Sequence, residues 1–242
     1  MHIEVGPYRF SAMDARRTLV HADDLLDGFA ESVHAHQTER RARIAAAVDG
    51  LDQMHADVDD LRSPIDTVWR ELLAAREDAL AAGALPATAT GQVVHLAVSD
   101  GGVPKRAVDR IEVDFGGVVG DRQATRRHHG SPFQALCIWN EETIAGLVAD
   151  EHPIAAGAAG ENVTVAGIDW PSLCPGVRLR IGTVLCEISS YAVPCKQNAR
   201  WFSDGVFDRI HHRHGPISRL YATVIEPGTV KVDDLVIVEP ET

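Results

Sequence analysis

The chain has 242 residues, of which 45% are hydrophobic and 24% charged, a composition that argues against disorder and allows a sizeable core. Its 35 acidic and 23 basic residues give a formal net charge of −12, which disfavours nucleic acid and anionic membranes as general partners. The sequence has no apolar run of the ~18 residues that span a membrane, and its start resembles no secretory signal. The four cysteines form no CxxC pair, so we expect unpaired thiols and a cytoplasmic location.

Residues 1–86 are predicted to form a helical accessory segment. From Ile44 to Leu72 apolar residues recur every seven positions, with a second set three positions after the first, which is typical of a helical packing seam. The pair Ser63-Pro64 predicts a helix start. The expected helices are 11–35, 38–61 and 64–83. This segment shows no chemistry of its own, and we expect it to pack on the rest of the chain or on a second copy in a homodimer.

The period changes after Gly91, where short β-rich runs alternate with glycine-containing turns. The expected strands are 92–98, 108–113, 135–139, 162–165, 177–181, 184–190 and 235–239, with short helical insertions at 140–150 and 203–212. So many strands in ~150 residues indicate a sandwich or a barrel. The predicted class is therefore α+β, with a mostly β, barrel-like domain over 91–242 that follows the helical segment.

Two glycine-containing turns carry polar side chains. Gly120-Asp121 ends a glycine-rich stretch that matches neither a dinucleotide fingerprint nor a P-loop. Gly160-Glu161-Asn162 combines a permissive backbone with hydrogen-bonding side chains, which suits close approach to a ligand. Each is also compatible with an ordinary tight turn.

Basic residues gather in two stretches of this acidic chain. The first is Arg126-Arg127-His128-His129-Gly130, which suits an anion, and its histidines can exchange protons near neutral pH. The second spans residues 196–219, with five Lys or Arg and two Asp, and it includes Lys196 and Arg200. Phosphate binding and a solvated surface loop are the alternatives for both stretches.

Cys195 is the candidate reactive thiol. It follows Pro194 just after a predicted strand, and the neighbouring Lys196 would favour its thiolate, the form that attacks electrophiles and binds soft metals. Cys137 and Cys186 lie in apolar β patterns and are interpreted as core residues, whereas Cys174 lies in a predicted turn.

Taken in order, these elements resemble the MOSC family, which is named for the C-terminal domain of molybdenum cofactor sulfurase. The residues that carry the resemblance are Gly120-Asp121, His129-Gly130 with Pro132 and Ala135, Gly160-Glu161-Asn162 with Gly167, Ile181-Gly182, Pro194-Cys195 and the Tyr221–Val230 segment. The resemblance covers about residues 91–240. Ser131 and the run Lys196-Gln197-Asn198 depart from the family pattern.

The resemblance implies a barrel-like fold in which Cys195 ligates the molybdenum of the molybdopterin cofactor or carries sulfur. Some relatives reduce N-hydroxylated compounds. On this basis Cys195, His129 and Asp121 are the expected catalytic residues. The expected cofactor-binding residues are Gly120, Arg126, Arg127, His128, Gly130, Gly160, Glu161, Asn162, Lys196 and Arg200.

Three functions remain open at this point. The first is a molybdenum-dependent reductase that takes a small-molecule substrate and electrons from an external donor, since no flavin, haem or iron–sulfur motif is visible. The second is a sulfur or cofactor carrier with a persulfide on Cys195. The third is a non-catalytic module that binds a small molecule. Molybdenum content and cyanide-labile sulfur distinguish the three.

Overall fold

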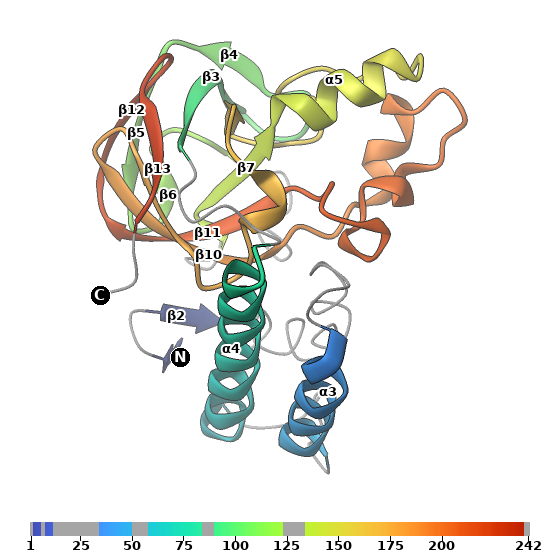
Figure 1. The fold of residues 1–242 in the computed structure, drawn as a ribbon. Helices are drawn as coiled ribbons and strands as arrows, with labels where there is room; N and C mark the ends of the chain where they lie inside the picture. The colour runs from blue at the N-terminus through green and yellow to red at the C-terminus, as the bar shows by residue number, and fades with distance from the viewer. Residues whose placement is uncertain are drawn as a thin grey trace.

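A computed structural model describes residues 2–5, 8–11, 34–49, 58–83, 90–122 and 134–239. Figure 1 shows two helices, α3 and α4, below a β-barrel that carries shorter helices at one side. The predicted α+β class and the order of its parts, helices first and a barrel second, are confirmed. None of the helices in the described ranges is both long and apolar enough to cross a membrane.

The N-terminal part contains α3 (His34–Val48) and α4 (Val58–Ala81), preceded by a hairpin of β1 (His2–Val5) and β2 (Tyr8–Ser11). The hairpin was not predicted. Most of the helix expected over 11–35 falls outside the described residues. The bidentate pair between Arg43 and Glu71, at 2.5 and 2.8 Å, ties α3 to α4.

The helix start predicted at Ser63-Pro64 is wrong, because Pro64 lies inside α4. Proline supplies no N–H to a helix, and in an isolated helix interior it costs about 3 kcal/mol. Here the residues on either side, Leu61 and Ile65, are both fully buried, as the seven-residue spacing predicts. Burial of this seam therefore outweighs the local preference of Pro64.

Seven strands close the barrel in the order β3, β13, β9, β10, β11, β7 and β8, with β8 pairing back to β3. All neighbouring pairs are antiparallel except β7 and β8, which are parallel. The closing strands are β3 (Thr90–Val98), β7 (Leu136–Asn140), β8 (Val163–Ala166), β9 (Arg178–Ile181), β10 (Val184–Tyr191), β11 (Leu220–Glu226) and β13 (Leu235–Val238). Closure leaves these strands without a free edge and buries one continuous core.

Smaller elements complete the domain. The strand β4 (Arg106–Val108) extends β3, and β5 (Arg110–Asp114), β6 (Gly117–Val118) and β12 (Gly228–Lys231) form a separate sheet. The helices are α5 (Glu141–Ala149), η4 (Trp170–Ser172), η5 (Lys196–Trp201), η6 (Phe207–Ile210) and η7 (His212–His214). The expected strand 108–113 is therefore divided between β4 and β5. The expected insertion at 140–150 is confirmed as α5, and that at 203–212 consists of 3-10 turns.

The α4 helix packs against the barrel through the η4 region. Arg76 Nε donates to the carbonyl of Ser172 at 3.3 Å, and the contact is buried. Gly176 has φ of +95°, and a Cβ there would lie 2.7 Å from a methyl carbon of Leu73. Glycine is therefore required where the helix meets the loop. The helices share the hydrophobic core of the barrel and are not a detached unit.

Candidate functional site

Cys195 occupies the N-cap of η5, four residues after β10 ends. All four cysteines lie in described parts of the chain, and Cys195 is the exposed one, while Cys137, Cys174 and Cys186 are buried. Burial raises the pKa of the Cys137 thiol to about 11 and that of Cys186 to about 12. Of the four cysteines, only Cys195 therefore presents its sulfur to a ligand or partner.

Asn198 holds the backbone of Cys195. The Cys195 N–H donates to Asn198 Oδ1 at 3.2 Å, and the thiol lies 3.6 Å from the same oxygen. On its other side, Asn198 Nδ2 donates to the carbonyl of Ala159 at 3.3 Å. Asn198 is only 2% exposed, so one buried amide links the Cys195 loop to the turn that precedes β8.

Arg219 approaches the same carbonyl from the segment that leads into β11. Its Nη1 donates to Ala159 O, and the residue is 5% exposed. Burial disfavours the charged guanidinium, but the negative charges of Cys137, Tyr221, Glu161 and Cys195 together raise the pKa of Arg219. Its Nε has no hydrogen-bond partner within the described structure. A buried cation with an unused N–H thus lies within electrostatic reach of Cys195.

The turn itself is built around Glu161, which is fully buried. Glu161 Oε1 accepts the N–H of Gly157 at 2.5 Å. Burial raises the pKa of this carboxyl, although backbone N–H groups and the charges of Arg219 and Lys105 act in the opposite direction. Gly160 has φ of +99°, a conformation that favours glycine, and a Cβ there would lie 3.2 Å from Val103. The backbone of this turn is therefore restricted by the hydrogen bond from Gly157 to Glu161 and by the conformation of Gly160.

Asp121 is the centre of a second set of buried contacts. Its carboxylate accepts from Ser99 N at 2.6 Å, Lys105 Nζ at 2.5 Å and Asn162 Nδ2 at 3.0 Å. The side chains of Lys105 and Asp121 are 7% and 4% exposed. Asn162 also donates to the carbonyl of Ala97 at 3.2 Å. This geometry gives Asp121 a bracing role; its catalytic role, drawn from the family resemblance, remains a prediction.

The structure brings together the turn at Gly160–Asn162, Asp121 and, through Ala159, Cys195. Lys196 and Arg200 are exposed on η5, and the Arg200 guanidinium lies 5.4 Å above the ring of Trp201. Gly120 is exposed, with φ of +85°. Arg126, Arg127, His128, His129 and Gly130 lie outside the described residues.

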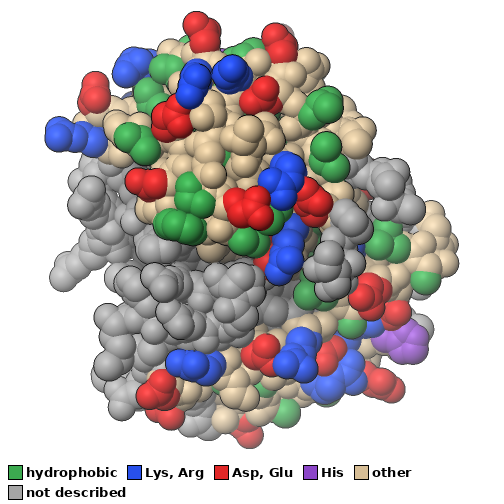
Figure 2. Space-filling model, turned by 90° about the vertical axis from the view of Figure 1, so that its left-hand side faces the viewer, with side chains coloured by type: hydrophobic (Ala, Val, Ile, Leu, Met, Phe, Trp, Pro, Cys, Tyr) green, Lys and Arg blue, Asp and Glu red, His purple; other side chains and the backbone are tan. Residues whose placement is uncertain are grey.

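The basic residues of the second stretch divide into separate contacts. Arg209 pairs with Asp204, and His214 Nε2 lies 2.9 Å from Asp208. His212 is buried and stacks on Tyr191 at a ring distance of 5.2 Å. On the face drawn in Figure 2, acidic, basic and hydrophobic side chains are likewise mixed. From this stretch, the described structure brings Arg219, its last residue, into contact with the site through Ala159.

Three residues of the site were not identified from the sequence, namely Lys105, Asn198 and Arg219. Asn198 was noted only as a departure from the family pattern, and Arg219 only as one of five cations. Their partners are 16, 39 and 60 positions away along the chain. A capping box, formed by Cys195 and the residue three positions later, is the one local signal for Asn198.

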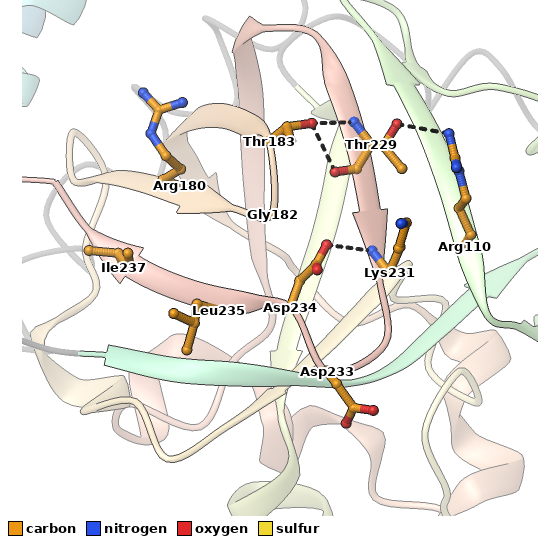
Figure 3. Close-up of a pocket in the computed structure, with 10 residues that line it drawn as sticks. All are labelled: Arg110, Arg180, Gly182, Thr183, Thr229, Lys231, Asp233, Asp234, Leu235 and Ile237. Carbon is orange, nitrogen blue, oxygen red and sulfur yellow. Dashed lines mark hydrogen bonds between the residues drawn. The ribbon is translucent and has the colours of Figure 1, made fainter.

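A separate cleft of about 720 Å³ lies at the opposite end of β10, where Thr183 joins β9 to β10. An eight-residue strand, roughly 23 Å long, separates this end from the end that leads to Cys195. Figure 3 shows that Thr229 is hydrogen-bonded to Thr183 on one side and to Arg110 on the other. Arg180 is paired with Glu226 and Glu239. Several of the polar side chains that line the cleft are therefore already hydrogen-bonded or ion-paired within the protein. Among the described residues, no group of three or more metal-ligating side chains occurs.

Comparison with known proteins matches residues 125–237 to the MOSC domain. Protein YiiM of Escherichia coli (strain K12) is 30% identical over 138 residues, which are 52% of this chain and 61% of that protein. The uncharacterized protein YflK of Bacillus subtilis (strain 168) is 32% identical over 113 residues, 46% of this chain and 50% of the relative. The chain therefore spans between half and about three fifths of the length of these relatives.

Two crystal structures are similar in fold. One, of a hypothetical protein, has a TM-score of 0.53 at 22% identity and covers 63% of this chain and 70% of its own. The other, YiiM from Geobacillus stearothermophilus, has a TM-score of 0.50 at 22% identity and covers 62% and 75%. These two structures share the fold of this chain, and the conclusion from the comparisons is that residues 125–237 match the MOSC domain.

Proposed function

We propose that this chain binds the molybdenum cofactor through Cys195 and reduces N-hydroxylated compounds. The observation that carries the proposal is an exposed cysteine on a braced loop, beside a buried arginine, within a MOSC domain. The donor set fits such a group. A thiolate is a soft ligand suited to molybdenum, and the unused Nε–H of Arg219 is a donor for an anion.

Each residue of the site has a distinct task in this proposal. Cys195 binds the metal, and Asn198 orients Cys195. Arg219 offsets the negative charge that a thiolate brings into the site, and Glu161, whose pKa burial raises, holds the neighbouring turn by accepting the N–H of Gly157. When bound, the cofactor would supply oxygen-atom transfer and two-electron chemistry; electrons would come from an external donor.

The test is the molybdenum content of protein produced in a host that makes the cofactor. We expect close to one molybdenum per chain in the wild type and in Cys137→Ser, and about a tenth or less in Cys195→Ser, because loss of a metal ligand removes most affinity. Reduction of an N-hydroxylated base analogue with a chemical reductant should follow the same order.

Two results would contradict the proposal. Equal molybdenum content in Cys195→Ser and the wild type would remove Cys195 as the ligand. A wild type without molybdenum but with cyanide-labile sulfur on Cys195 would instead identify a sulfur carrier, for which an exposed thiol is equally suited.

A further inference from the structure

The Asn198 side chain is hydrogen-bonded to both Cys195 and the Gly157–Asn162 turn. The first group it meets is a donor, the N–H of Cys195. The second is an acceptor, the carbonyl of Ala159. A carboxamide offers one oxygen and one NH₂ group, so both contacts can be made at once.

These two partners fix the orientation of the amide. If the Asn198 amide were turned over, its NH₂ would face the N–H of Cys195 and its oxygen would face the carbonyl of Ala159. Both hydrogen bonds would be lost in a site that is 2% exposed. The Asn198 oxygen is therefore held 3.6 Å from the Cys195 sulfur by the backbone on either side.

Other residue types cannot reproduce this arrangement. Aspartate keeps the oxygen for Cys195 but has no N–H for Ala159, and alanine has neither. Glutamine carries the same amide one methylene further from the backbone. In a common capping box Ser or Thr is paired with Glu or Gln, whereas here the cap is Cys195 and its partner is Asn198.

We propose that Asn198 is the positioning residue of this site and fixes the Cys195 thiol against the Gly157–Asn162 turn. A ligand bound to the sulfur then meets the turn at a set distance, without a cost for ordering the η5 loop. This role deepens the proposed function, which makes Cys195 the working residue, but it is measurable without the cofactor.

The turn keeps a second anchor when Asn198 is changed. Arg219 Nη1 donates to the same Ala159 carbonyl from the start of β11. Glu161 holds the turn at Gly157. Substitution of Asn198 should therefore loosen the link between the two segments without unfolding the barrel.

Hydrogen exchange of the full-length chain tests the role, with Asn198→Asp, Asn198→Ala and the control Gln197→Ala. Gln197 is an exposed neighbour whose backbone carbonyl accepts a hydrogen bond from Arg200. In both Asn198 variants we expect exchange in residues 157–162 to rise about fivefold or more, because the donor to Ala159 is gone. The Cys195 amide should exchange faster only in Asn198→Ala, since aspartate still accepts its N–H.

The rate of alkylation measures the accessibility of the Cys195 thiol independently. Iodoacetamide should modify Cys195 about fivefold faster in Asn198→Ala than in Gln197→Ala or the wild type, because the loop is released. Exchange in 157–162 within twofold of wild type in both Asn198 variants would show that Asn198 only caps η5, and would overturn the proposal. If Asn198→Ala fails to fold, Asn198→Asp, which keeps the shape of the side chain, still tests the proposal by hydrogen exchange in residues 157–162.

The cofactor experiment separates this inference from the proposed function. Molybdenum retention should fall about tenfold in Asn198→Asp, as it does when a residue that orients a metal ligand is lost. If the wild type retains no molybdenum, the proposed function is wrong, and the exchange experiment alone decides the role of Asn198.

Discussion

Removal of the Asp121 carboxylate should destabilise the barrel far more than removal of an ordinary surface aspartate. Asp121 accepts hydrogen bonds from Ser99, Lys105 and Asn162 at 2.5 to 3.0 Å, and its side chain is 4% exposed. In Asp121→Asn the oxygen still accepts from Ser99, but the positive charge of Lys105 stays buried without its counterion. The expected cost is about 3–5 kcal/mol, the usual penalty for breaking a buried pair by removal of one partner.

Urea unfolding followed by circular dichroism measures this cost. Exposed Asp109, substituted by Asn, is the control and should change stability by no more than about 0.5 kcal/mol. The double variant Lys105→Met/Asp121→Asn should recover part of the loss, with a coupling of about 1–3 kcal/mol, because the uncompensated charge is gone. A cost below about 1 kcal/mol for Asp121→Asn, or strict additivity with Lys105→Met, would refute the bracing role.

Three further outcomes follow from buried side chains. Ile65→Ala should cost about 2–5 kcal/mol in urea unfolding, because the side chain is fully buried in α4; a loss below about 1 kcal/mol would contradict the seam. At pH 8 iodoacetamide should modify Cys137 at least about a hundredfold more slowly than Cys195, since the pKa of Cys137 is raised to about 11; equal rates by mass spectrometry would contradict its burial. Because burial raises the folded-state pKa of Glu161, its stabilising contribution is complete below the unfolded-state pKa and declines as pH rises through the folded-state value. Glu161→Gln should therefore lose less stability than the wild type as the pH rises above about 4.5, and parallel pH curves would contradict this.

The barrel could be predicted from the sequence because its strands carry local signals. Alternation of apolar residues, bounded by glycine turns, located strands such as 184–190, which the structure extends by one residue to Tyr191. The hairpin turn at Gly182 has φ of +56°, as a glycine between two strands suggests. The start of α4 was misplaced, because the local preference of Pro64 carries no information about the partners that Leu61 and Ile65 find in the fold.

The site could be predicted only in part, for a related reason. Cys195 was recognisable from its neighbours, since a proline before a cysteine at a strand end is a local pattern. Arg219 was not, because its partner Ala159 lies 60 positions earlier and contributes only a carbonyl. Every residue has a backbone carbonyl, so the sequence does not show which carbonyl accepts a hydrogen bond from a side chain. A side chain that binds such a carbonyl cannot be recognised from its residue type.

The position of the buried charges affects how the site would hold an anion. Lys196 and Arg200 are exposed, and attraction between exposed charges is screened over about 10 Å at 0.1 M salt. Arg219 is buried within the domain, where screening is weak, and its charge is offset by groups that are themselves buried, among them Glu161. A buried pair of unlike charges seldom improves stability over apolar residues, which is consistent with the ligand-binding role that the proposed function gives to Arg219. An anion held by Arg219 would depend on the fit of the site, whereas one held by Lys196 and Arg200 would depend on ionic strength.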